Sequence, residues 1–201
     1  LSMNNYESMS DEKLALRYID GDNKAFDVLL TRNQSKLFSY IMFVVRDEEI
    51  ANDIFQDTFL KVITKLQEGK YTDSGKFYYW ITRIAHNIIM DKYRMQQNEH
   101  IVEPTEDNNL SNIKSASVLD TYRESEIINE QIMEDVKNIM NALPAVQREV
   151  VYMRFYQDMS FKEIADATGV GINTSLGRMR YAILNMRRMA QKHDISLNFE
   201  M

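Results

Sequence analysis

The sequence has no cysteine, only six glycines and only two prolines among its 201 residues. Without cysteine there can be no disulfide, thiol nucleophile or cysteine-bound zinc, which fits a reducing compartment such as the cytoplasm. The shortage of glycine and proline leaves few turn signals and favours long helices. No apolar run approaches the roughly 18 residues that a membrane span needs. We therefore expect a cytoplasmic protein with no membrane insertion.

Charge of one sign is missing from two stretches, although the net charge of the whole chain is only −6. Residues 47–57 hold five acids and no base, and residues 171–192 hold five bases and no acid. Residues 70–94 hold five bases and two acids, whereas residues 99–135 hold ten acids and two bases. This block pattern indicates that different segments meet partners of different charge.

Apolar residues recur at helical spacing in two separate parts of the chain. The pattern extends from Leu14 to Tyr93, fades in the segment EHIVEPTEDNNLSNIKSASVLD, and resumes near Ser125. We therefore expect an all-α fold with two small helical domains joined by a flexible acidic linker. The expected bounds are 10–98 for the first domain, 99–124 for the linker, 125–193 for the second domain and 194–201 for a loose tail.

The segment RDEEIANDIFQDTFLKVITKLQ is typical of a helix with an acidic face. Its apolar stripe consists of Ala51, Phe55, Phe59, Val62 and Leu66. A second stripe on another face, which could meet a basic partner, consists of Glu49, Asp53, Gln56 and Asp57. Lys61 and Lys65 follow near the helix end that favours cations. An ordinary solvated helix face would carry the same charges, so this segment alone does not distinguish a partner-binding face from a solvated one.

The segment SGKFYYWITRIAHNIIMDKYRMQQ combines a core stripe with a basic and aromatic one. Phe77, Ile81, Ile84 and Ile88 form the apolar stripe. The second stripe lies about a quarter turn away and consists of Lys76, Trp80, Arg83, Asn87 and Arg94. Cations, an amide and a stacking ring are the groups that bind single-stranded DNA, although a core edge with solvated cations remains an alternative. We interpret His86 as a surface or capping residue rather than a metal ligand.

The segment MSFKEIADATGVGINTSLGRMRYAILNMRRM is the most specific in the chain and predicts a helix-turn-helix. Ser160 and Glu163 match a capping box, and Gly169 supplies the turn. A second helix should begin near Gly171 to Asn173 and place its first residues in a major groove. Those residues are Asn173, Thr174, Leu176, Gly177, Arg178, Arg180 and Tyr181. Glycine weakens a helix interior, so Gly177 indicates a position where a binding partner approaches the helix backbone closely. An ordinary helical hairpin with a basic face is the alternative.

Together these segments resemble the extracytoplasmic-function branch of the sigma factor family, which retains only conserved regions two and four. The likeness to region two lies in Asp53, Gln56, Asp57 and Phe59 and in the tract FYYWITRIAHNIIMDKYR. The likeness to region four lies in Leu143, Pro144 and Arg148 and in the Glu163-Ile164-Ala165 triplet. The chain departs from the family at Ser175 and Leu176, where relatives commonly have an apolar and then a polar residue. The register of that helix therefore stays open.

The resemblance implies three binding surfaces. The face with Glu49, Asp53, Gln56 and Asp57 would bind core RNA polymerase. The stripe from Lys76 to Arg94 would melt and bind the minus-ten promoter element, and the second helix of the helix-turn-helix, with Arg148, would bind the minus-thirty-five element. Relatives are commonly held inactive by an anti-sigma factor, so one is an expected partner. In relatives the linker threads through polymerase, and its acidity here suits a basic surface.

Two other classes of protein would explain part of the sequence. A stand-alone helix-turn-helix regulator would explain the second domain but leave Trp80 and Asp53 without a role. A helical enzyme would need a metal triad, a nucleophile pair or a glycine-rich phosphate loop, and the sequence has none of these. We therefore expect a binding protein that is not an enzyme, with no catalytic residues, no metal and no cofactor.

Overall fold

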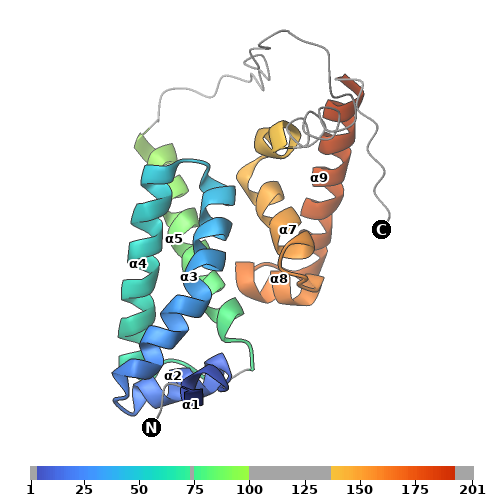
Figure 1. Ribbon diagram of the computed structural model, residues 1–201. Helices are drawn as coiled ribbons and strands as arrows, with labels where there is room; N and C mark the ends of the chain where they lie inside the picture. The colour runs from blue at the N-terminus through green and yellow to red at the C-terminus, as the bar shows by residue number, and fades with distance from the viewer. Residues whose placement is uncertain (1–3, 73–74, 100–136, 193–201) are drawn as a thin grey trace, which may run out of the picture.

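The computed structural model describes residues 4–72, 75–99 and 137–192, and every regular element within these ranges is a helix. The helices form two bundles that lie side by side (Figure 1). The first bundle contains α1 to α5 and the second contains α7 to α9. This confirms the all-α fold with two helical parts. The predicted linker after Glu99, the predicted start of the second domain and the tail lie outside the described residues.

The first bundle is built from four long or medium helices and one short one. They are α1 (Asn4–Glu7), α2 (Asp11–Ile19), α3 (Asn23–Val45), α4 (Glu48–Gln67) and α5 (Phe77–Glu99). Ser10 caps α2 and Asp47 caps α4, since each side chain accepts a backbone N–H from the first turn. Large side chains such as Leu14, Leu37 and Ile81 are completely buried between these helices. α4 and α5 therefore have fixed inner and outer faces.

The buried side of α4 differs from the predicted stripe at its centre. Ala51, Val62 and Leu66 are buried as expected, but Ile54 and Thr58 take the central positions. Phe55 and Phe59 are only partly buried, and their rings lie 5.0 Å apart on the flank of the bundle. Thr58 can be buried because its hydroxyl donates a hydrogen bond to the Ile54 carbonyl at 2.6 Å.

The second bundle contains the predicted helix-turn-helix. A helical segment at 137–142 precedes α7 (Ala145–Phe155), α8 (Phe161–Thr168) and α9 (Ile172–Lys192). The capping box is present, because Ser160 and Glu163 each accept the other's backbone N–H. Gly169 ends α8 with a φ of 68°, a conformation that glycine adopts without strain. The predicted turn and the predicted start of the second helix are both confirmed.

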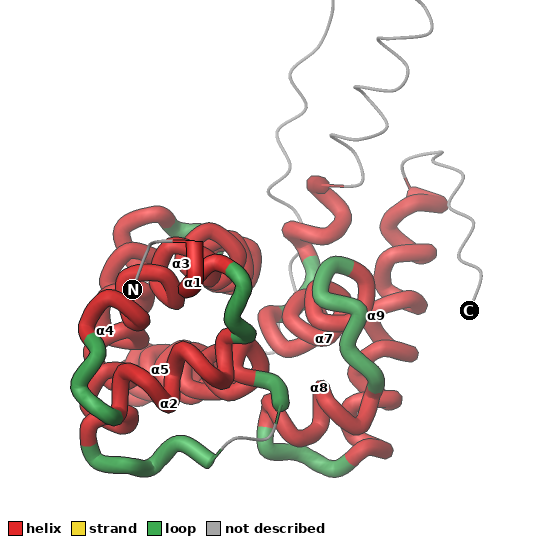
Figure 2. Tube along the Cα trace, turned by 60° about the horizontal axis from the view of Figure 1, so that its bottom comes forward, coloured by secondary structure: helices red, strands yellow, loops and turns green. Residues whose placement is uncertain are grey.

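The two bundles touch along two pairs of helices. α3 packs against α7, and α5 packs against α8. Figure 2, in which the bottom of the molecule comes forward, shows α8 on the side of the second bundle that faces α5. In the part of the chain that the structure describes, no helix is long and apolar enough to cross a membrane. The seam between the bundles includes part of the predicted DNA-binding stripe.

Candidate nucleic-acid interface

The acidic face of the first domain lies on the outer side of α4. Glu49, Asp53, Gln56 and Asp57 are all exposed, as their spacing predicts for a face opposite the buried side. Asp53 lies 3.5 Å from the Lys92 ammonium of α5, and its own side chain remains 64% exposed. An ion pair this open is weak and can exchange for another cation. The four side chains are therefore available to a basic partner.

The two stripes predicted on α5 are confirmed. Phe77, Ile81, Ile84 and Ile88 are buried, whereas Lys76, Arg83, Asn87 and Arg94 are exposed and Trp80 is half-buried. Lys76 comes just before the first residue of α5. At 1.5 Å per residue the stripe extends about 27 Å along the helix axis, long enough to follow several nucleotides. Arg94, at the far end, lies 3.3 Å from Asp91 in an open ion pair.

Trp80 is fixed by its neighbours on one side and open on the other. Its ring lies 4.9 Å from Tyr71 and 5.7 Å from Phe77, measured between ring centroids. The start of α5 is fixed by Glu12 of α2, whose carboxylate accepts the Phe77 N–H at 3.0 Å. Burial tends to raise the pKa of Glu12, but this and other hydrogen bonds outweigh burial and lower it. A rigid ring at a capped helix start is suited to stack on a base.

A groove that the sequence did not predict joins α4 to the middle of α5. It is lined by Leu60, Lys61, Thr64, Lys65, Glu68, Ile84 and Asn87. Leu60 is 63% exposed although it is apolar. The two lysines, which the sequence assigned only to the helix end, thus lie beside Asn87 and add cations to the stripe. The sequence did contain a signal for this placement, because residues four positions apart, such as Lys61 and Lys65, lie on the same face of a helix.

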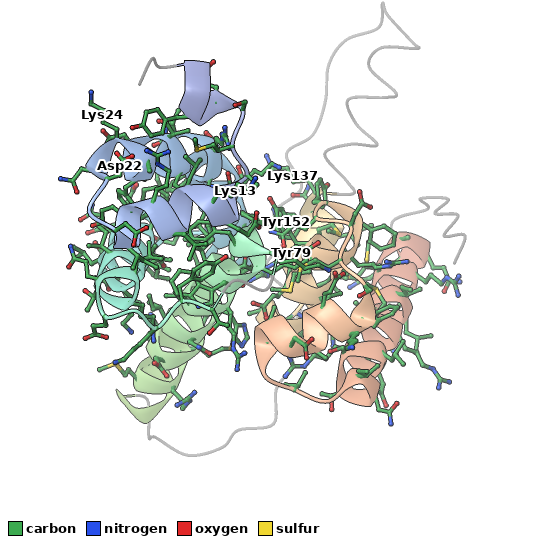
Figure 3. The ribbon with its side chains drawn as sticks, turned by 90° about the horizontal axis from the view of Figure 1, so that it is seen from below. Lys13, Asp22, Lys24, Tyr79, Lys137 and Tyr152 are labelled. Atoms are coloured by element: carbon green, nitrogen blue, oxygen red, sulfur yellow. The ribbon has the colours of Figure 1, made fainter. Side chains whose placement is uncertain are left out.

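The Lys76 end of the stripe faces the second domain across a cleft of about 410 Å³. The first domain lines it with Lys76, Tyr79, Trp80 and Arg83, and the second lines it with Ser160, Lys162, Glu163, Asp166 and Ala167. Lys76 forms an ion pair with Glu163 and lies 5.2 Å from the ring centroid of Tyr79. Tyr79, which the sequence did not single out, lies with Tyr152 at the seam between the domains (Figure 3). This end of the stripe is therefore partly covered by α8.

The outer face of α9 is open. Asn173, Thr174, Leu176, Arg180 and Tyr181 are exposed, and Gly177 and Arg178 are half-buried. Ser175 is 1% exposed and faces the core with Met179, whereas Leu176 is 43% exposed. The inward and outward positions thus follow the family pattern even though the residue types at 175 and 176 differ. The predicted residues therefore lie on the accessible side of α9, and their contacts with DNA stay a prediction.

Arg148 is the one predicted DNA contact that this arrangement does not expose. It is 6% exposed on α7, and its guanidinium donates to the carbonyls of Asn141, Leu143 and Val44 at 3.1, 2.7 and 2.6 Å. Val44 lies in the last turn of α3, where carbonyls lack intrahelical partners and attract cations. Burial lowers the pKa of this guanidinium. Arg148 therefore links the two domains instead of facing a groove.

The interpretation of His86 as a surface or capping residue was wrong. His86 is 5% exposed, and its Nδ1 lies 2.7 Å from the carboxylate of Glu149 on α7. The Tyr40 hydroxyl of α3 donates to the same carboxylate oxygen at 2.5 Å. Burial, together with the adjacent carboxylate, raises the pKa of Tyr40 well above its usual range. Tyr40 therefore stays a neutral donor.

Comparison with protein families gives one match for each domain. Residues 29–99 match the model for sigma-70 region 2, and residues 133–175 match the model for sigma-70 region 4. Together the two matches cover more than half of the chain, in the order in which the two helical bundles occur.

Similar proteins extend over most of the chain. The chain is 26% identical over 178 residues to RNA polymerase sigma-H factor of Pseudomonas aeruginosa, covering 84% of this chain and 88% of that protein. It is 25% identical over 175 residues to ECF RNA polymerase sigma-E factor of Escherichia coli K12, covering 86% and 90% respectively.

Two solved structures share the fold. One is the sigma factor RpoE in complex with the anti-sigma factor NepR from Bartonella quintana, with a TM-score of 0.60, 21% identity and coverage of 84% of this chain and 98% of that one. The other is CnrH in complex with the cytosolic domain of CnrY, with a TM-score of 0.61, 21% identity and coverage of 90% and 97%.

Proposed function

The chain belongs to the sigma-70 family of RNA polymerase sigma factors, and from this premise we propose how its surfaces divide the work of promoter recognition. The first domain binds core RNA polymerase through α4 and the minus-ten element through α5. The second domain binds the minus-thirty-five element through α9. In this proposal the chain contributes binding surfaces, and the polymerase performs the chemistry of transcription.

The observation that carries the proposal is that α4 and α5 present opposite chemistry on one rigid bundle. Glu49, Asp53 and Asp57 are exposed on α4, and Lys76, Trp80, Arg83 and Asn87 line α5. The acidic face suits a basic surface of polymerase, whereas the cations and the ring suit the phosphates and bases of a separated strand. A helix-turn-helix regulator that acts alone would have no use for either surface.

The second domain supports recognition of duplex DNA. The exposed end of α9 offers Asn173 and Arg180, whose amide and guanidinium can form paired hydrogen bonds with adenine and guanine. Leu176 can contact a thymine methyl group. Two weak contacts held by one polymerase act at high effective concentration, so the free chain should bind promoter DNA poorly.

An anti-sigma factor is a further proposed partner. Two proteins with this fold have been solved in complex with such a factor or with the cytosolic domain of a partner chain. We extend this class of partner to the chain on the strength of the shared fold and family.

The direct test is run-off transcription with bacterial core polymerase on a broad promoter library, with and without the chain. The expected result is a set of transcripts that depend on the chain and share two sequence elements. No dependent transcript, together with no binding to core polymerase, would contradict the proposed function. Tight operator binding by a dimer without polymerase would instead favour a stand-alone regulator.

The polymerase surface has its own test. Replacing Asp53 and Asp57 by lysine puts like charges against a basic partner, which costs several kcal/mol, or a hundredfold or more in affinity for core polymerase. The matched control replaces Asp20 and Asp27, exposed acids elsewhere in the same domain, by lysine. The control should bind core polymerase nearly normally. Equal binding by both variants, each with an unchanged circular dichroism spectrum, would remove α4 as the polymerase surface.

A further inference from the structure

A cavity of about 600 Å³ lies in the seam between the domains, and Tyr79 separates it from the smaller cleft beside Lys76. Tyr78 and Tyr79 line it from the first domain, and Tyr152 and Tyr156 line it from the second. Tyr79 and Tyr152 are labelled at this seam in Figure 3. The remaining lining residues are polar or charged, namely Asp11, Arg32, Asn33, Lys36, Gln157 and Asp158. A cavity of this size with aromatic walls and a few polar groups is typical of a site for a small organic ligand.

The ring of Tyr156 has one supported face and one open face. Its plane stacks on the ring of Tyr152, with 5.0 Å between the centroids and 15° between the planes. Phe43 supports Tyr152 in turn at 4.8 Å. Tyr156 itself is 68% exposed, so its outer face can stack on a flat heterocycle without any movement of the pair.

Two of the four charged side chains that line the cavity already have partners. Arg32 donates to one oxygen of Asp11 at 3.0 Å and to three backbone carbonyls, and Asn33 donates to the other oxygen of Asp11 at 2.8 Å. Lys36 and Asp158 are exposed and make no ion pair with any residue that the structure describes. The cavity therefore presents a cation from one domain and a carboxylate from the other, both available to a ligand.

The backbone at Asp158 is strained. Its φ is 51°, in the left-handed region that glycine adopts freely and that aspartate and asparagine only tolerate. The Asp158 carboxylate accepts no hydrogen bond from any described residue, so no contact of this side chain offsets the strain. Local strain without a structural benefit points to a function for the side chain.

Gln157, next to Asp158, adds an unsatisfied polar atom. Its amide donates to the Tyr78 hydroxyl across the seam at 2.8 Å, and its Oε1 is buried with no hydrogen-bond partner among the described residues. Exchanging the two ends of the amide would leave a donor unpaired instead. A rotation of this side chain toward a bound ligand would recover the lost hydrogen bond.

We propose that this cavity binds a guanine nucleotide. The guanine ring stacks on Tyr156, its N1–H and N2–H groups donate to the two oxygens of Asp158, and the phosphate pairs with Lys36. A carboxylate only accepts hydrogen bonds, and guanine presents two adjacent donors on its pairing edge. Adenine and cytosine each present an acceptor beside the donor there. This site is additional to the surfaces of the proposed function and does not depend on them.

The nucleotide would also act on the arrangement of the domains. The stacking ring and Asp158 belong to the second domain and Lys36 to the first, so the complete site exists only when the two domains are docked. A ligand that binds one arrangement stabilises it. Guanosine monophosphate (GMP) at a hundredfold excess over its Kd should therefore raise the Tm of the chain by about 5 °C.

The direct test is isothermal titration calorimetry of the full chain with GMP. Three compounds serve as matched comparisons: adenosine monophosphate (AMP), inosine monophosphate (IMP), which lacks only the 2-amino group, and guanosine, which lacks only the phosphate. Each comparison removes at least one hydrogen bond or ion pair to a charged side chain. GMP should bind about tenfold more tightly than any of the three.

Two variants assign the contacts. Asp158→Asn keeps a residue that tolerates a positive φ but removes the paired acceptors, so it should bind GMP about tenfold more weakly and no longer prefer GMP to IMP. Lys36→Gln should weaken GMP binding about tenfold and leave guanosine binding unchanged. The controls Asp27→Asn and Lys24→Gln change exposed residues outside the cavity and should bind GMP as the wild type does.

Three results would overturn the nucleotide site: no binding of GMP, equal binding of GMP and AMP, or wild-type affinity for GMP in Asp158→Asn. An unchanged circular dichroism spectrum excludes misfolding as the cause of any loss. A single-stranded oligodeoxyguanylate tests whether the base belongs to a nucleic acid, and binding of this strand without binding of GMP would also overturn the proposal. Failure of the chain to support transcription would contradict the proposed function alone, because the calorimetry needs no polymerase.

Discussion

The two proposed DNA-binding surfaces of this sigma factor differ in how far the folded chain exposes them. The proposed recognition helix α9 presents Leu176 and Tyr181 at 43% and 62% exposure. The stripe on α5 meets α8 across a cleft, and its Lys76 already pairs with Glu163. The end of α9 is therefore open, whereas the Lys76 end of the stripe on α5 is partly covered by α8.

This difference matches the chemistry of the two DNA targets. In the proposed function, α9 binds the minus-thirty-five element as a duplex, which exists before polymerase acts. In the same proposal the stripe on α5 binds a separated strand, and a fully open cationic and aromatic stripe would also bind unrelated single strands.

The largest effect that we predict concerns Arg148, which the structure removes from the open surface. Arg148→Ala removes three hydrogen bonds, and although Arg46 still donates to the Asn141 carbonyl and Tyr93 to the Val44 carbonyl, the Leu143 carbonyl loses the Arg148 donor. We expect the substitution to lower the free energy of unfolding by about 3 kcal/mol. Urea denaturation of the full chain measures this. Arg187→Ala, at an exposed arginine of α9, should change it by less than about 0.5 kcal/mol.

The opposite result for Arg148 would change the comparison. If Arg148→Ala left the unfolding free energy intact but weakened binding to a minus-thirty-five duplex, Arg148 would belong to the DNA surface, as the family resemblance implies. The closed seam would then be a minor arrangement of the free chain.

A medium effect should separate the two surfaces directly. Trp80→Ala and Arg180→Ala each remove a DNA contact worth about 1–3 kcal/mol. In the complex with polymerase, we expect each to weaken binding of its own promoter element. In the free chain, only Arg180→Ala should weaken DNA binding, because α9 is open and the Trp80 end of the stripe is covered.

Fluorescence anisotropy with a minus-thirty-five duplex and with a minus-ten single strand measures both effects. Trp80→Phe, which keeps a stacking ring, is the control and should retain most of the strand binding. The comparison would break if Trp80→Ala weakened strand binding by the free chain as much as it does in the complex.

Local physics allowed the sequence to predict the helices and the helix-turn-helix. The capping box at Ser160 and Glu163, the turn at Gly169 and the start of α9 all depend on residues within a few positions of one another. The buried face of α4 was harder to predict, because consecutive side chains are separated by only about 100° around the helix axis. Phe55 was expected inside, but Ile54 lies there, and Thr58 is buried by bonding its own backbone.

Contacts between the domains could not be predicted from the sequence. His86 and Glu149 are 63 positions apart, and Arg148 and Val44 are 104 apart. His86, Glu149 and Arg148 have polar side chains, which fit a surface interpretation until their partners are known, and Val44 accepts only through its backbone carbonyl. The family resemblance did not help, because it assigns residues to partners of the chain and not to each other.

The smallest predicted effect concerns Gly177 in α9, where a substitution should raise stability but weaken DNA binding. A Cβ at this position would meet nothing within 4 Å in the described chain, so the fold does not require glycine there. Gly177→Ala should therefore raise the free energy of unfolding by about 1 kcal/mol. If the backbone of α9 approaches duplex DNA at this point, the added methyl group should weaken binding to the minus-thirty-five duplex and leave strand binding unchanged. The control Gln191→Ala, at the other end of α9, should change neither the free energy of unfolding nor the affinity for the duplex. A Gly177→Ala variant that gains stability and keeps full duplex affinity would place the DNA contact elsewhere on the helix.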